Sequence, residues 1–144
     1  MTEQTIAIAV DHGGFILKAA AISEAERAGW TVLDLGTDSE ESVDYPDYAE
    51  KLVAAMKRGE AARGILICGT GIGISIAANR HPGIRAALCY DDRTATLARQ
   101  HNDANVLCMG GRTTDEETAR SMIRIFLSTA FEGGRHARRV AKLG

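Results

Sequence analysis

Short apolar runs alternate with amphipathic stretches along the whole chain of 144 residues, and this alternation limits the folds that the chain can adopt. The apolar runs have the length of strands, and most are apolar on both faces, as strands buried in a parallel sheet are. We expect strands at residues 5–10, 31–35, 64–68, 84–88 and 105–109. Helices are expected at residues 14–28, 46–58, 72–79, 93–101 and 115–130.

This βα repeat predicts an α/β domain with one five-stranded parallel sheet. Right-handed crossovers would place helices on both faces of the sheet, which makes the fold doubly wound. Hydrophobic residues make up 45% of the chain and charged residues 25%, and no linker interrupts the pattern, so we expect residues 1–144 to form a single domain. Ligands of such sheets bind at the carboxyl ends of the strands, so the residues that follow each strand are the first candidates for a site.

The residues after the third expected strand predict an anion site with a thiol at its edge. Gly69, Gly71 and Gly73 leave consecutive backbone N–H groups unobstructed, and the helix that follows adds unpaired donors and a positive dipole end. That field would favour the thiolate of Cys68, which makes this residue a candidate proton acceptor. A single cysteine at the end of a buried strand is more often a small packing residue, but the three glycines favour the chemical interpretation.

The glycine loop does not match the two common nucleotide-binding patterns. A dinucleotide fingerprint would need a third glycine where this chain has Ile74, and the phosphate loop GxxxxGK[ST] needs a lysine that this stretch lacks. We therefore expect an anion smaller than a dinucleotide.

Two further loops at the same expected edge of the sheet are rich in glycine and polar residues. Asp11-His12-Gly13-Gly14 follows the first strand, and Gly110-Gly111-Arg112 follows the fifth. His12 either faces a ligand or is an exposed residue beside a helix-capping aspartate, and the convergence of three loops favours the ligand. Asp44 and Tyr45 begin a helix with a proline early in it, and we interpret them as structural.

The last third of the chain carries a second group of candidates. Arg135 and Arg139 are four residues apart and so share one helical face, where two guanidinium groups would form a phosphate clamp. A solvated basic end is the alternative, but a preceding pair of glycines allows an arm that docks elsewhere, even on a second subunit. His101 and Asn102 close the fourth expected helix, where the amide of Asn102 could address a sugar hydroxyl or an oxyanion.

Composition excludes several classes of function. A net charge of −2 and 5% aromatic residues argue against nucleic-acid binding. No apolar run approaches the roughly 20 residues of a membrane-spanning helix. The start Met1-Thr2-Glu3-Gln4 does not resemble a signal peptide, so we expect a cytoplasmic protein. Cys68, Cys89 and Cys108 lack the spacing of a zinc site or a disulfide framework, and we expect free thiols.

Four ordered motifs resemble the ribose-5-phosphate isomerase type B family, and together they cover nearly the whole chain. They are Asp11-His12-Gly13-Gly14, the run from Ile67 to Asn79, Arg99-Gln100-His101-Asn102 and Glu132-Gly133-Gly134-Arg135-His136. The resemblance implies a Rossmann-like α/β domain with a C-terminal helical arm. It also implies an aldose–ketose isomerase that moves a proton between C1 and C2 of a sugar phosphate through an enediolate, with no metal and no cofactor.

The resemblance also implies roles for individual residues. Cys68 would be the proton acceptor, in the branch of the family that has no glutamate at the position of Ile74, and His101 would open the furanose ring. Each site would lie between two subunits of a homodimer, while a homotetramer stays open. The implied catalytic residues are Cys68, Thr70 and His101, and the implied substrate contacts are Asp11, His12, Gly69, Thr70, Gly71, Ile72, Gly73 and Asn102, with Arg112, Arg135 and Arg139 on the phosphate.

Two alternatives remain open at this stage. One is an isomerase of another aldose phosphate, such as allose 6-phosphate or galactose 6-phosphate, because discrimination over one carbon is worth only about 1–3 kcal/mol. The other is a sugar-phosphate binding module without catalysis, against which the presence of Cys68 argues.

Overall fold

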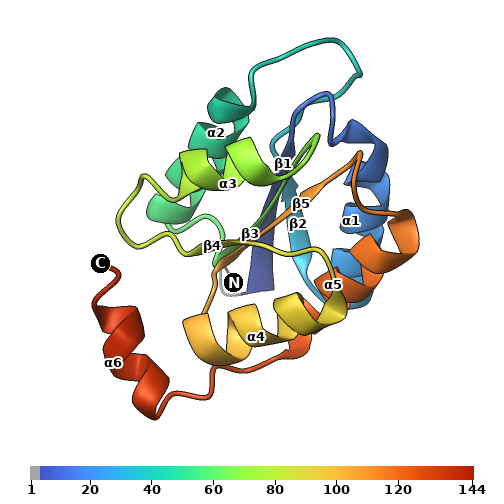
Figure 1. The fold of residues 1–144 in the computed structure, drawn as a ribbon. Helices are drawn as coiled ribbons and strands as arrows, with labels where there is room; N and C mark the ends of the chain where they lie inside the picture. The colour runs from blue at the N-terminus through green and yellow to red at the C-terminus, as the bar shows by residue number, and fades with distance from the viewer. Residues whose placement is uncertain (1–3) are drawn as a thin grey trace.

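The computed structural model describes residues 4–144, which form one parallel sheet between two layers of helices (Figure 1). The strand order is β2-β1-β3-β5-β4, and every neighbouring pair is parallel. The strands are β1 (Thr5–Val10), β2 (Thr31–Asp34), β3 (Arg63–Cys68), β4 (Ala86–Leu88) and β5 (Val106–Gly110). The five predicted strands are confirmed, with their ends shifted by at most two residues.

The largest shift concerns β4, which was expected from residue 84 and begins at Ala86. Ile84 belongs to a turn, in which its N–H donates to the carbonyl of His81 at 3.2 Å. The N–H of Arg85 donates to the side-chain oxygen of Asn105 at 2.7 Å in place of a ladder partner. The apolar sequence runs through this turn, so it could not reveal where pairing starts.

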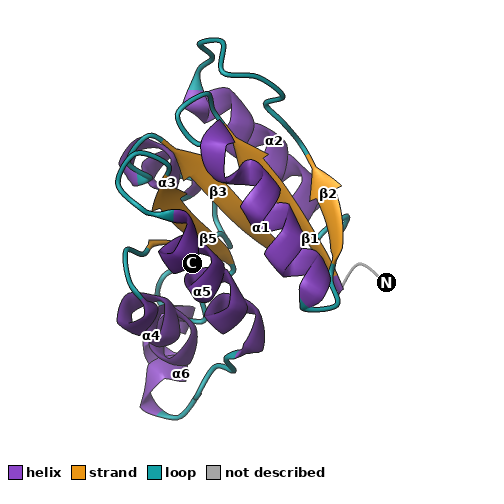
Figure 2. Ribbon diagram, turned by 90° about the vertical axis from the view of Figure 1, so that its right-hand side faces the viewer, coloured by secondary structure: helices purple, strands orange, loops and turns teal. Residues whose placement is uncertain are grey.

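The helices cover both faces of the sheet, as predicted for a doubly wound fold (Figure 2). Helices α1, α4 and α5 pack over one face, while α2 and α3 pack over the other. Their bounds are α1 (Phe15–Arg27), α2 (Tyr45–Lys57), α3 (Ile72–Ala78), α4 (Asp92–Asn102), α5 (Glu116–Ser128) and α6 (Arg135–Ala141). The predicted C-terminal arm is α6, which contacts α4.

Alternate residues of each central strand face opposite layers of the core. Ile65 and Ile67 of β3 are fully buried in the layer of α1 and α5, whereas Leu66 and Cys68 are buried in the layer of α2 and α3. Because the strands are buried on both faces, they read as continuous apolar runs in the sequence.

The direction of the chain reverses at the carboxyl ends of β1 and β3. From β1 the chain crosses to β2 on one side, and from β3 it crosses toward β4 on the other side. The helices that follow these two strands, α1 and α3, cover opposite faces of the sheet. Such a reversal of strand order marks the usual ligand site of open parallel sheets.

The same topology places the end of α4 at the opposite edge of the sheet. Helix α4 runs back from the carboxyl end of β4 toward the start of β5, and α6 lies beside it at that amino edge (Figure 1). Strand β3 has six residues, so the two edges are separated by roughly 16–20 Å.

The three cysteines are free and buried, as predicted. Among residues 4–144, no helix has the length and apolar character needed to cross a bilayer. Residues 1–3, which carried most of the argument against a signal peptide, lie outside the described residues.

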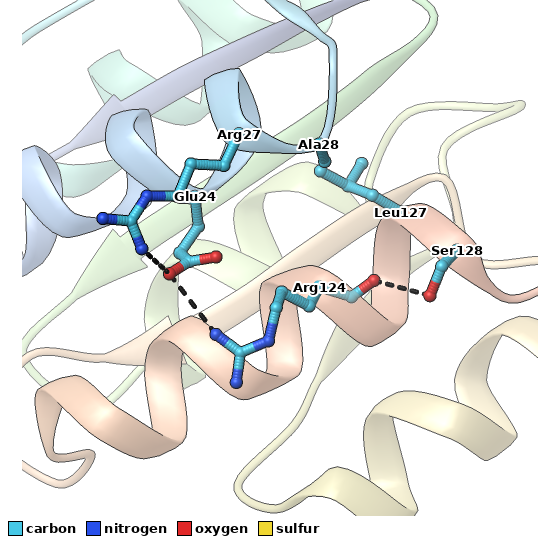
Figure 3. Close-up of a pocket in the computed structure, with 6 residues that line it drawn as sticks. All are labelled: Glu24, Arg27, Ala28, Arg124, Leu127 and Ser128. Carbon is cyan, nitrogen blue, oxygen red and sulfur yellow. Dashed lines mark hydrogen bonds and ion pairs between the residues drawn. The ribbon is translucent and has the colours of Figure 1, made fainter.

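A charge cluster ties α1 to α5 beside a hollow of about 490 Å³ (Figure 3). The carboxylate of Glu24 is 2% exposed and lies 3.2 Å from Arg120, 3.3 Å from Arg124 and 3.5 Å from Arg27. Burial alone would raise the pKa of Glu24, but hydrogen bonds from Arg120 and Arg124 outweigh it and hold the pKa below its usual value. With three cations on one carboxylate, we interpret this cluster as a structural link between the helices.

Candidate active site

Three loops meet at the carboxyl edge of β1, β3 and β5, and backbone hydrogen bonds hold them together. The N–H of Asp11 donates to the carbonyl of Ile67 at 3.1 Å. The N–H of Gly111 donates to the carbonyl of Cys68 at 2.8 Å, and that of Arg112 to the carbonyl of Gly69 at 2.9 Å. The predicted convergence of the three loops is therefore confirmed.

The loops approach so closely that side chains would not fit between them. A Cβ atom on Gly14 would collide with the carbonyl of Ile67, and one on Gly111 would collide with the carbonyl of Gly13. On Gly13 it would lie 2.9 Å from the backbone of Gly69. These glycines are needed because the loops pack directly against one another. From the sequence alone, this packing role could not be distinguished from a direct role in ligand binding.

The thiol of Cys68 lies at the end of β3, directly beneath the turn that begins α3. Gly71 has a φ of +80°, a left-handed conformation that suits glycine, and its N–H points at the cysteine. This N–H donates to Sγ of Cys68 at 3.1 Å, and the side chain is 4% exposed. A donor aimed at the sulfur stabilises negative charge there, which is what a proton acceptor needs.

The start of α3 differs from the prediction in one respect. The hydroxyl of Thr70 accepts a hydrogen bond from the N–H of Ile72 at 3.2 Å, so one predicted anion donor already has a partner. Helix α3 also has only seven residues, which limits its dipole. The individual N–H groups of the loop, more than the helix as a whole, supply the positive potential.

His12 and Arg112 line a hollow of about 300 Å³ beside this loop, together with Gly13, Ile16, Glu40 and Gly111. Nδ1 of His12 accepts a hydrogen bond from the N–H of Val43 at 3.2 Å, so a neutral ring carries its proton on Nε2. The guanidinium of Arg112 is exposed and lies against Gly69. A cation and an imidazole on one hollow suit an anionic or hydroxyl-rich ligand.

The carboxylate of Asp11 shapes the turn that presents His12. It is buried, and its Oδ1 accepts hydrogen bonds from the N–H groups of Gly13 at 2.8 Å and Gly14 at 3.1 Å. The helix-capping role weighed for this aspartate is not present, because Gly14 is the N-cap of α1 and no side chain caps the helix. His12 beside the aspartate lines the hollow.

Lys18 is a supporting residue that the sequence analysis missed. Its ammonium lies 3.0 Å from Asp34 and 2.9 Å from Asp38, and it donates to the carbonyl of Thr37 at 2.8 Å. Burial alone would lower the pKa of Lys18, but its hydrogen bonds to Asp38 and Asp34 raise it above the usual value. The lysine anchors the start of the loop that carries Val43 to His12, and no local sequence signal links groups so far apart.

Asp44 and Tyr45 have structural contacts, as interpreted from the sequence. Asp44 occupies the N-cap of α2, where its carbonyl accepts from the N–H of Asp47 at 3.1 Å but its side chain makes no capping hydrogen bond. The ring of Tyr45 lies over Gly73, where a Cβ atom would be 2.5 Å from Cζ.

The second group of predicted residues lies away from the thiol, where α4 ends and α6 packs. His101 is in the last turn of α4, and its ring stacks on that of His136 with 4.2 Å between centroids. Asn102 is exposed, and Arg135 and Arg139 are exposed on α6. One chain therefore holds two separate groups, at opposite edges of its sheet.

These features define an α/β domain with a glycine-rich cluster of loops at the carboxyl edge of its sheet, and comparison with known proteins names its class. The chain belongs to the Ribose/Galactose Isomerase family, whose model matches residues 6–143. It is 49% identical over 135 residues to ribose-5-phosphate isomerase B of Escherichia coli (strain K12), covering 94% of this chain and 91% of that protein.

Solved structures of relatives have the same fold. Type B ribose 5-phosphate isomerase of Trypanosoma brucei superposes with a TM-score of 0.94 at 49% identity, covering 99% of this chain and 97% of that one. A ribose 5-phosphate isomerase from Thermotoga maritima gives a TM-score of 0.93 at 54% identity, with 96% of each chain covered. The Rossmann-like arrangement expected from the resemblance is confirmed, and the chain is an isomerase.

We expect Gly71→Ala to destabilise the protein more than Gly59→Ala. Both glycines have a positive φ, +80° and +77°, so both substitutions carry a backbone cost of about 1–2 kcal/mol. At residue 71 the new Cβ would also lie 2.7 Å from the backbone of Met109, whereas nothing lies within 4 Å at residue 59. Overpacking adds about 1–3 kcal/mol. Urea denaturation measures both losses of stability, and equal losses would contradict the close contact between the turn at Gly71 and the backbone of β5 at Met109.

Proposed function

We propose that this chain interconverts ribose 5-phosphate and ribulose 5-phosphate, with Cys68 as the base that moves the proton. The observation that carries the proposal is the Cys68 sulfur at the carboxyl edge of the sheet, with the N–H of Gly71 3.1 Å away. The family and the names of close relatives support the substrate.

The reaction needs two proton-transfer stages, for which this chain has separate groups. His101 would open the furanose by moving the proton of the C1 hydroxyl to the ring oxygen, as the bond from C1 to the ring oxygen breaks and the C1 carbonyl forms. The Cys68 thiolate would then take the proton from C2 and return it to C1, while the hydroxyl proton of O2 moves to O1. Negative charge develops on the enediolate oxygens between these two transfers. The N–H groups of residues 69, 70 and 73 would be the donors nearest to this charge, because those of Gly71 and Ile72 already donate to Cys68 and Thr70. Donors already in place lower the barrier because they need no reorganisation.

We propose that a second copy of the chain completes each site. Cys68 and His101 lie at opposite edges of one sheet, roughly 16–20 Å apart, so one chain does not bring them to the same sugar. Apolar side chains are also exposed beside the glycine loop: Ile72 is 53% exposed and Ile76 59%. On the neighbouring edge of the sheet, Tyr90 is 69% exposed. A homodimer would bury this surface and bring the partner's α4 and α6 to the thiol, with Asn102 on the sugar and Arg135 and Arg139 on the phosphate. Whether dimers pair further stays open.

The remaining predicted roles fit this arrangement. His12 and Arg112 line one hollow, which would take the polar end of the substrate. Thr70 is exposed and lies two residues after Cys68. A free thiol as the base suits a reducing compartment, which supports the predicted cytoplasmic location.

A six-carbon aldose phosphate is the second candidate substrate, because the family model covers galactose isomerases as well. Parallel measurements of kcat/KM for ribose 5-phosphate and allose 6-phosphate distinguish the two. Folded protein without turnover of either sugar would favour a binding role.

We expect Cys68→Ala to lower kcat for ribose 5-phosphate by about 10²- to 10⁴-fold, because a positioned base is lost. Turnover is measured after EDTA treatment by following ketose formation. The matched control is Cys89→Ala: this thiol is also buried, burial raises its pKa to about 11, and it lies in the other layer of the core. Near-normal turnover in Cys68→Ala would remove the thiol from the mechanism.

Mixing two inactive variants tests the shared site. Cys68→Ala and His101→Asn should each be inactive as homodimers, but a mixed dimer would contain one site with both groups intact. Unfolding and refolding an equal mixture should restore about a quarter of the wild-type sites. If both groups act within one chain, the mixture stays inactive, and the shared-site proposal fails while the reaction itself is untouched.

Arg139→Ala should raise KM for ribose 5-phosphate by roughly ten- to a hundredfold, the size of one charge-assisted hydrogen bond, with a much smaller effect on kcat. The phosphate is remote from the reacting carbons, so its loss mainly weakens binding. Arg138→Ala is the matched control, because this neighbour on α6 is also exposed and lies about 100° around the helix axis from Arg139. A collapse of kcat at unchanged KM would exclude the clamp.

A further inference from the structure

Two imidazoles and one carboxylate gather where α4 ends and α6 begins. The rings of His101 and His136 are stacked with 4.2 Å between centroids and 15° between planes. Oε1 of Glu132 lies 3.8 Å from Nε2 of His136. One possible ligand atom from each of the three residues lies within 4.8 Å of the other two.

Backbone hydrogen bonds hold this cluster together before any ligand arrives. The N–H of Glu132 donates to the carbonyl of Gln100 at 3.0 Å, which fixes the segment before α6 to the last turn of α4. The guanidinium of Arg99 donates to the carbonyl of Thr129 at 3.0 Å and supports the same junction. The three side chains are thus brought together by the fold of a single chain.

One buried nitrogen of the cluster makes no hydrogen bond. Among residues 4–144, Nε2 of His136 is buried without a hydrogen-bond partner, and the residue as a whole is 6% exposed. Buried polar nitrogens nearly always have a hydrogen-bond partner. This nitrogen has none and lies near a carboxylate and a second imidazole, which indicates that it binds a ligand.

The geometry points to a binding site for a divalent transition metal of the zinc class, with His101, Glu132 and His136 as its three protein ligands. Two histidines and one glutamate form a donor set that zinc takes, with a fourth position for water. Neutral imidazole is the form that binds metal.

The site has to tighten slightly to hold an ion. Ligand atoms around four-coordinate zinc lie roughly 3.4 Å apart when the bonds are about 2.0–2.2 Å long. The carboxylate of Glu132 is half-exposed and His101 is only partly buried, so both can move, while the buried His136 stays in place.

Nearby charges limit how tightly this site can bind a cation. Arg135 and Arg139 oppose a cation, and Glu132 offsets only part of their field. We therefore expect reversible, moderate binding. An ion on His101 would occupy the imidazole that ring opening needs, so it would inhibit the enzyme; this consequence rests on the proposed function, but the binding does not.

Titration of the intact chain with zinc chloride, followed by calorimetry without sugar, tests the site. We expect one ion per chain, and affinity at least about tenfold lower in Glu132→Gln and His136→Ala. Glu132→Gln is the main variant, because Glu132 is exposed and its loss should leave the fold intact, which thermal unfolding verifies. His81→Ala is the matched control: His81 pairs with Glu50 at 2.7 Å at an exposed position, and among residues 4–144 no third histidine, cysteine or carboxylate joins them in a metal-sized group.

Cobalt(II) provides a second readout. Visible d–d absorption of a four-coordinate ion that disappears in Glu132→Gln and persists in His81→Ala supports the site. A sulfur-to-cobalt charge-transfer band would place the ion on a cysteine and overturn the proposal. No saturable zinc binding, or equal zinc affinity in the wild type and Glu132→Gln, would also overturn it. If zinc inhibits turnover and Glu132→Gln relieves the inhibition, the site is linked to His101. If zinc binds without inhibiting turnover, the metal site is still supported, but the proposed ring-opening role of His101 is contradicted.

Discussion

Close packing of the three loops at the carboxyl edge of β1, β3 and β5 is the constraint on which the rest of the structure depends. Where Gly14 passes Ile67 and Gly111 passes Gly13, the backbones leave no room for a Cβ atom. This contact brings the Cys68 thiol under the turn at Gly71 and sets Arg112 beside the same turn. Any side chain inserted there would push the loops apart, so these glycines are needed for packing. In the proposed reaction they would also keep the backbone donors in place.

Polar groups outside the site support it from two directions. Lys18 neutralises Asp34 and Asp38 and fixes the start of the loop that reaches His12 through Val43. At the other edge of the sheet, Arg99 joins the end of α4 to the segment that follows α5. Both cations are almost fully buried, and each donates to a backbone carbonyl as well as to a carboxylate, as a buried charge requires.

Parallel strands explain why the functional groups divide into two sets. Each crossover helix returns to the amino edge, so a residue at the end of α4 lies far from a residue at the end of β3. In the proposed homodimer, a second copy of the chain would bring both sets to one small sugar. The exposed isoleucines beside the glycine loop would give that copy an apolar surface.

The sequence by itself determined the strands, the helices on both faces, the three converging loops and the shared face of Arg135 and Arg139, because periodicity and glycine placement are local signals. It did not show that β4 starts at Ala86, that Thr70 occupies the N–H of Ile72, or that Lys18 supports His12. It also did not show that His136 buries an unpaired nitrogen against His101. These features depend on contacts between residues distant in the chain, and only the tertiary structure decides which distant groups meet.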